Sequence, residues 1–95
     1  MRSEVMWFAN QMEKKLRQTG YKGDRDAWLN STAEYLLDRL LDEAKELVIA
    51  VREEERIRRG RVGLDAVIDE CVDVANFSMM LADRIRYLRA LEEVE

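Results

Sequence analysis

The chain has no proline, no histidine and only one cysteine among its 95 residues. Without histidine it cannot form a histidine-assisted serine or cysteine hydrolase, nor a histidine-ligated zinc site. The single cysteine, Cys71, excludes an internal disulfide and any CxxC pair, which fits a reducing compartment. The absence of proline permits long unbroken helices, because proline is the residue that interrupts a helix most strongly.

Long apolar runs are also missing. The longest stretch without a charged side chain is nine residues, 74–82, whereas a membrane-spanning helix needs roughly 20 apolar residues. The first residues lack the apolar run of a signal peptide. We therefore expect a single soluble, cytoplasmic domain over residues 1–95 that makes no contact with a membrane.

The charge balance is acidic, with 20 acidic against 16 basic residues and a net charge of −4. This sign disfavours general binding to nucleic-acid phosphates, so we expect no nucleic-acid partner. Four arginines crowd residues 56–61, but three glutamates at 53–55 precede them and cancel much of their charge. We interpret this segment as a solvated turn. The surplus of carboxylates indicates that acids, with a bound cation, would carry any chemistry.

The hydrophobic pattern predicts an all-α fold. No stretch alternates with period two, which argues against strands. Helical periodicity predicts helices over residues 3–19, from about 28 or 31 to 58, and over 64–91, with Gly20 just after the first and a capping box at Ser31 and Glu34 opening the second. Gly20 and Gly23 bracket one loop, and Gly60 and Gly63 another. We expect two long antiparallel helices with a shorter N-terminal helix laid against them.

Apolar residues on the two long helices exceed what one hairpin can bury. On the second helix they form one arc: Leu36, Leu37, Leu40, Leu41, Ala44, Leu47, Val48 and Val51. The third helix carries two stripes on roughly opposite sides: Val67, Val74, Phe77, Leu81, Ile85 and Leu88 on one, and Ile68, Val72, Ala75, Met79 and Ala82 on the other. We therefore expect the chains to assemble into an oligomeric helical bundle, as an obligate homo-oligomer.

Two acidic pairs stand out, Glu43-x-x-Glu46 and Glu70-x-x-Asp73. Residues three apart share a helix face, so antiparallel packing could unite all four carboxylates. Most such pairs are solvated, but Glu70 lies at the centre of an apolar arc and Glu43 at the edge of another. An ionised carboxylate there is costly unless it is paired or binds a cation.

We expect basic partners for these acids to be scarce nearby. Lys45 points to the opposite side of its helix, and Arg84 lies roughly 20 Å further along the third one. An all-oxygen site then favours Mg²⁺, with Mn²⁺ as a second possibility. The chemistry indicated is metal-assisted hydrolysis of a phosphoanhydride. Glu46, on the polar side of its helix, is the carboxylate best placed to act as the water-activating base.

The two acidic pairs, separated by 23 residues, resemble the ExxE…ExxD signature of the MazG-like all-α nucleoside triphosphate pyrophosphatases. Residues 40–47 resemble the first motif helix of that family, and residues 70–77 the second; the resemblance covers about residues 28–82. It implies hydrolysis of a (deoxy)nucleoside triphosphate between the α- and β-phosphates, giving monophosphate and pyrophosphate. It also implies Mg²⁺ ligation by Glu43, Glu46, Glu70 and Asp73, and sites that lie between the subunits of a homodimer or homotetramer.

The resemblance further implies that Asn76 contacts sugar or phosphate, whereas base and sugar specificity stay open. The chain departs from the larger family members in being one short module without a tandem copy. Trp28 follows a loop that contains Lys22, so it could stack on a base while Lys22 meets phosphate; alternatively, Trp28 packs into the core. The alternative for the whole chain is a non-enzymatic helical module, a homo-oligomeric interaction or adaptor protein whose acids only maintain solubility.

Overall fold

The protein is built from helices in a long, open arrangement. The computed structural model describes the backbone of residues 1–94 and the side chains of residues 1–20 and 23–93. The helices are α1 (Ser3–Gln18), a 3₁₀ turn (Gly20–Gly23), α2 (Arg25–Leu29), α3 (Ala33–Ile57) and α4 (Arg61–Val94). The described residues contain no strand, so the predicted all-α class is confirmed.

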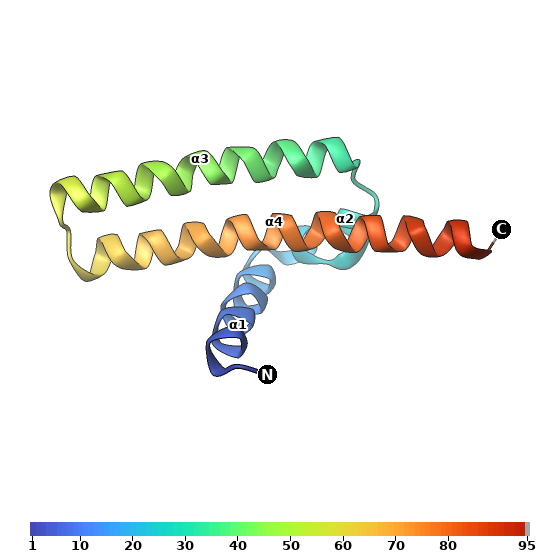
Figure 1. Cartoon of the computed structure of the whole chain (residues 1–95), viewed down its shortest axis with the longest axis horizontal. Coiled ribbons are helices and arrows are strands. Elements are labelled where there is room, and N and C mark those ends of the chain that lie inside the picture. The colour runs from blue at the N-terminus through green and yellow to red at the C-terminus, as the bar shows by residue number, and fades with distance from the viewer. Residues whose placement is uncertain (95) are drawn as a thin grey trace.

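The two longest helices, α3 and α4, pack side by side and antiparallel, as predicted (Figure 1). With 34 residues, α4 is about 51 Å long, nearly the full 55 Å of the molecule. Both α1 and α2 pack against α4, and the N-terminal half of α1 projects away from the hairpin (Figure 1). The helix α4 is therefore the element that every other helix contacts.

The start of α3 differs from the prediction. The helix begins at Ala33, where the Thr32 hydroxyl oxygen accepts a hydrogen bond from the Tyr35 N–H at 3.0 Å. Ser31 does not cap it, because its hydroxyl donates instead to the carbonyl of Ala27. Trp28 lies in the separate short helix α2, which the sequence pattern did not predict. The end of α1 agrees with expectation, since Gly20 follows it with a φ of +62°.

The turn between α3 and α4 is shorter than predicted. It ends at Gly60, and α4 begins at Arg61, so Gly63 lies inside the first turn of that helix. The Glu54 carboxylate accepts hydrogen bonds from the Arg59 and Gly60 N–H groups, both at 3.2 Å. A Cβ on Gly63 would lie 1.6 Å from a carboxylate oxygen of Glu54. Gly63 is therefore the residue that makes room for this cap, and it does not end a loop.

The buried core is small and lies where the helices meet. Trp28, Leu36 and Met80 form its centre. The third predicted helix, with its two apolar stripes, is α4. Part of its second stripe is covered within the chain, since Val72 is buried. Its other members are less enclosed: Ile68 and Ala82 are exposed.

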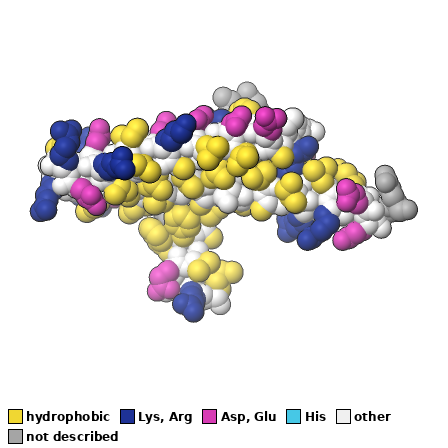
Figure 2. All heavy atoms as spheres, turned by 45° about the horizontal axis from the view of Figure 1, so that its top comes forward, with side chains coloured by type: hydrophobic (Ala, Val, Ile, Leu, Met, Phe, Trp, Pro, Cys, Tyr) yellow, Lys and Arg dark blue, Asp and Glu magenta, His cyan; other side chains and the backbone are white. Residues whose placement is uncertain are grey.

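The outer side of the hairpin is apolar and exposed. Leu37, Leu41 and Val48 of the α3 arc lie on the surface, because α4 covers only one side of that arc. Figure 2 shows hydrophobic side chains running along the long helices and onto α1, while many of the charged groups lie toward the two ends. No helix in the described part of the chain has the combined length and apolar character that crossing a bilayer requires.

Candidate metal centre and adjoining cavity

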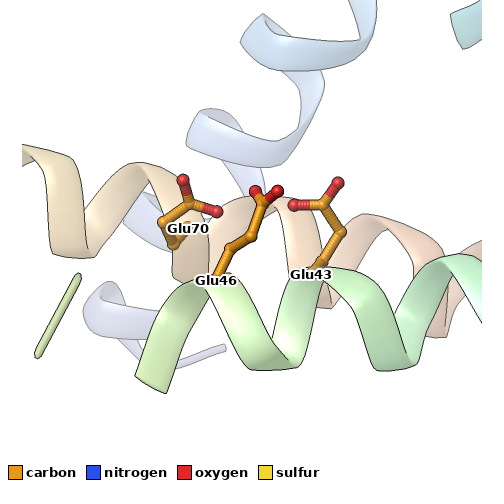
Figure 3. Close-up of side chains that lie close together, drawn as sticks. All are labelled: Glu43, Glu46 and Glu70. Atoms are coloured by element: carbon orange, nitrogen blue, oxygen red, sulfur yellow. The ribbon is translucent and has the colours of Figure 1, made fainter. Parts of the chain in front are cut away.

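Three of the four predicted metal ligands meet in space. Glu43 and Glu46 lie one turn apart on α3, and Glu70 comes from α4, which passes in the opposite direction. Each offers a carboxylate oxygen, and these oxygens lie within 4.8 Å of one another. Figure 3 shows the three carboxylates pointing to the same side of the helix pair. The antiparallel packing of α3 on α4 thus places acids 24 residues or more apart in the chain at one point.

Ionised carboxylates are energetically unfavourable in this cluster, because they are close together and partly buried. Glu43 is only 8% exposed, and burial, followed by the nearby charges of Asp73 and Glu46, raises its pKa from 4.5 to about 7. Burial, followed by the charge of Glu46, also raises the pKa of Glu70. One carboxylate oxygen of Glu43 and one of Glu70 are buried without a hydrogen-bond partner among the described residues. Glu46 is exposed and is the member of the cluster most accessible to water.

The fourth predicted ligand, Asp73, is paired with a lysine. Its Oδ1 lies 3.4 Å from Lys15 Nζ, and the same ammonium donates to both carboxylate oxygens of Asp69 at 2.9 and 3.0 Å. Asp73 still lies near the cluster, since its charge contributes to the raised pKa of Glu43. The pKa of Asp73 is itself raised by burial, and Lys15 opposes that rise.

The expectation that basic groups would be scarce nearby was wrong. Arg39 donates to Glu43 Oε1 at 3.1 Å, and Lys15 reaches Asp73 from α1. Arg39 could have been found, because residues four apart on a helix are neighbours. Lys15 had no local signal, since it lies 54 residues before Asp69. Both cations are residues of the site that the sequence reasoning missed.

A cavity of about 560 Å³ adjoins the carboxylates, within the range of roughly 300–1,000 Å³ common for small-molecule sites. Helices α1 to α4 all contribute to its wall. The charged part of the lining consists of Lys15, Arg39, Glu43 and Asp73. The aromatic part consists of Trp28, Tyr35 and Phe77. The cavity therefore combines a polar, ionic part with an aromatic part.

Asn76 is another buried residue of the cavity wall. It is 4% exposed, and its Nδ2 donates to the Met12 carbonyl at 3.2 Å, which ties α4 to α1. Its Oδ1 is buried and has no hydrogen-bond partner among the described residues. Asn76 therefore offers Oδ1 as an acceptor, while one of the two Nδ2 N–H donors is engaged by Met12. Such an acceptor suits a hydroxyl group better than a phosphate oxygen, which is itself an acceptor.

Trp28 packs in the core, which is the structural alternative stated for it above. It is 8% exposed, and its indole N–H donates to Asp83 at 2.9 Å. Asp83 also accepts from Arg25 and Arg86, and these bonds hold the pKa of its carboxyl far below the usual range. This network anchors α2 to α4 and keeps the indole against the cavity. The other residue predicted for this region, Lys22, lies outside the described side chains.

Comparison of the chain with protein-family models, with curated proteins and with solved structures finds no match. The resemblance to the MazG-like pyrophosphatases therefore stays a prediction based on the motif residues. The donor set itself fits a hard divalent cation, because all three clustered ligands are carboxylates and two of them keep a buried oxygen free.

Proposed function

We propose that the protein is a Mg²⁺-dependent hydrolase that cleaves a (deoxy)nucleoside triphosphate between the α- and β-phosphates, giving the monophosphate and pyrophosphate. The observation that carries the proposal is the buried Glu43 carboxylate, whose free oxygen belongs to a three-acid cluster beside a cavity with ionic and aromatic walls. The position of the cleaved bond comes from the motif resemblance alone.

A bound cation would compensate the negative charge of this cluster. Clustered acids raise one another's pKa, and burial adds to the effect. Arg39 compensates only one oxygen of Glu43. A divalent ion bound by Glu43, Glu46 and Glu70 would remove the repulsion, with Mg²⁺ as the first choice and Mn²⁺ as a substitute. When bound, the metal would neutralise phosphate charge during hydrolysis.

The remaining roles follow from exposure and hydrogen-bonding capacity. Glu46 is the exposed acid, so it is the cluster member that could take the proton from the attacking water instead of binding the metal. Asn76 Oδ1 is the free acceptor in the cavity and would take a hydrogen bond from a sugar hydroxyl. The aromatic part of the wall would pack against the nucleobase. Asp73 would join the metal ligands once its lysine partner is displaced.

We also propose that the chain works as a homodimer or homotetramer. Large apolar side chains stay exposed on both long helices: Leu37, Leu41 and Val48 on α3, and Ile85, Leu88 and Leu91 on α4. Extended apolar faces of this kind usually mark an interface. Light scattering after gel filtration measures the mass directly, and a substitution of Leu41 by lysine should lower it. A monomeric mass for the natural chain would contradict the assembly.

The same exposed faces favour the second candidate, a helical adaptor module without catalytic activity. In that case the acids are structural, and Mg²⁺ should not shift the melting temperature. Glu70→Leu would then be neutral or stabilising, because it replaces a partly buried carboxylate by an apolar group. A metal site predicts instead that Mg²⁺ raises the melting temperature and that Glu70→Leu abolishes this rise.

The deciding experiment is incubation of the full chain with a panel of nucleoside and deoxynucleoside triphosphates and Mg²⁺, with detection of monophosphate and pyrophosphate. Glu70→Gln removes the charge at nearly constant shape and should reduce turnover at least about a hundredfold. The matched control is Glu53→Gln, an exposed glutamate of α3 outside the cluster, which should keep full activity. Absence of turnover with every nucleotide, or full activity in Glu70→Gln, would overturn the proposal.

A further inference from the structure

Lys15 is the residue of the site whose position the proposed function leaves unexplained. Its ammonium lies 2.9 Å from Asp69 and 3.4 Å from Asp73, and the same side chain lines the cavity. Its side chain is 28% exposed, so it is enclosed by the site but not sealed in it. Lys15 therefore touches both the acidic region and the space available to a ligand.

The Lys15 ammonium lies between two aspartates whose negative charges repel each other. Asp69 and Asp73 are four residues apart on α4, so their like charges share one helix face and repel each other. Lys15 bridges the two. Glu43 and Glu70, each with one buried oxygen that has no partner among the described residues, lie next to this bridge and receive no hydrogen bond from it. The lysine thus neutralises one side of the acidic region and leaves the other open.

We propose that Lys15 and the divalent cation compete for Asp73, and that the displaced Lys15 ammonium then binds a phosphate group of the substrate in the cavity. The inference rests on the proposed function. Lys15 is then a substrate ligand that pairs with Asp73 as long as no metal is bound.

The side chain and its helix are suited to such an exchange. A lysine ammonium is a compact charge on a flexible four-carbon stem, with three donors that can be redirected. Its second partner, Asp69, is 55% exposed at the side chain, so breaking that pair leaves no buried charge behind. The helix α1 has no buried residue. The ammonium can therefore leave Asp73 without disrupting a packed core.

The inference predicts two effects of opposite sign in Lys15→Met. Removing the competing charge should tighten Mn²⁺ binding in the absence of nucleotide by about three- to tenfold. Removing the phosphate ligand should raise KM for the nucleotide about tenfold or more. A lysine that merely attached α1 to α4 would weaken metal binding and substrate binding together when lost.

The experiment is calorimetric titration of the full chain with Mn²⁺, followed by steady-state kinetics on the same preparations. The control is Lys14→Met, since Lys14 is exposed and forms no ion pair among the described residues. It should match the natural chain in both measurements. Lys15→Gln, which keeps a hydrogen-bond donor and removes the charge, is the second variant if Lys15→Met does not fold by circular dichroism.

The outcomes separate the inference from the proposed function. Tighter Mn²⁺ binding with a raised KM supports the exchange of Lys15 between Asp73 and phosphate. Unchanged or weaker Mn²⁺ binding, or an unchanged KM, overturns it while the hydrolase proposal stands, provided that the natural chain binds Mn²⁺ and turns over nucleotide. If the natural chain does neither, both proposals fall.

Discussion

Two buried carboxylates of this protein have opposite surroundings, although their exposure is almost the same, 7% for Asp83 and 8% for Glu43. Asp83 accepts four hydrogen bonds, from Arg25, Trp28 and Arg86, and its pKa lies far below the usual range. Glu43 has Arg39 as its partner and one buried oxygen without a partner in the described part of the chain, and its pKa is raised to about 7.

The difference shows that burial alone does not define a site. A buried carboxylate with all its acceptors occupied is a structural anchor, and Asp83 anchors α2 to α4 in this way. A buried carboxylate that keeps a free acceptor and acidic neighbours is costly for the isolated protein. Such a group has the properties expected of a ligand-binding residue.

Neutral substitutions at the two acids give the largest expected effects. Glu43→Gln should lower metal-dependent turnover at least about a hundredfold and leave the melting temperature of the metal-free protein unchanged or higher, because a buried charge among acids is removed. Asp83→Asn should lower the melting temperature by several degrees, because the two arginines and the indole lose an ionised acceptor, while Mn²⁺ affinity stays unchanged.

Thermal unfolding and Mn²⁺ titration of both variants test this pair, with Asp38→Asn as the control, since Asp38 is an exposed acid of α3. If Asp83→Asn abolished metal binding, or if Glu43→Gln destabilised the metal-free protein strongly, the contrast between anchor and ligand would be wrong.

The pH dependence of the two acids is the next largest effect. A carboxyl whose pKa is raised on folding binds more protons in the folded state, so its contribution to stability falls as pH rises from about 4.5 to about 7. Without metal, the melting temperature should decline over that window, and Glu43→Gln should reduce the decline. The lowered pKa of Asp83 has the opposite sign, and its stabilisation should be lost as pH falls below the ordinary value of 3.8.

Metal binding sharpens the same prediction. A cation competes with the proton on Glu43, so its apparent affinity should rise about tenfold per pH unit below pH 7 and level off above it. Calorimetric titration with Mn²⁺ at several pH values gives this slope. A flat profile between pH 5 and pH 7 would show that Glu43 does not bind the metal.

Removing one arginine partner of Asp83 or of Glu43 should give the smallest effects. Arg86→Met deletes one of several partners of Asp83, and Arg86 is 68% exposed at the side chain, so the loss of stability should be less than about 1 kcal/mol. Arg39→Met deletes the hydrogen-bond partner of Glu43 and should shift the activity profile slightly to higher pH, because Arg39 lowers the pKa of that carboxyl. Thermal melts and pH–rate profiles measure the two responses, and a large stability loss in Arg86→Met would contradict the ranking.

Helical spacing in the sequence predicts part of the site. Glu43 and Glu46 are one turn apart on any helix, and an antiparallel hairpin brings Glu70 to them. Spacing does not predict which of two neighbouring hydroxyls caps α3, where Thr32 and not Ser31 provides the cap. Both residues have a suitable hydroxyl, and the short preceding helix α2 engages Ser31 through the Ala27 carbonyl.

The all-α class, the two long helices and the faces on which the acids lie follow from the sequence, because helical periodicity and glycine breaks act over a few residues. The packing of the helices determines which charges from different helices meet. Lys15 reaches Asp73 from α1, and Asp83 collects its donors from α2 and from its own helix. Contacts between residues far apart in the sequence give Asp83 a full set of hydrogen bonds and do not do so for Glu43. Spacing along the chain does not predict this difference.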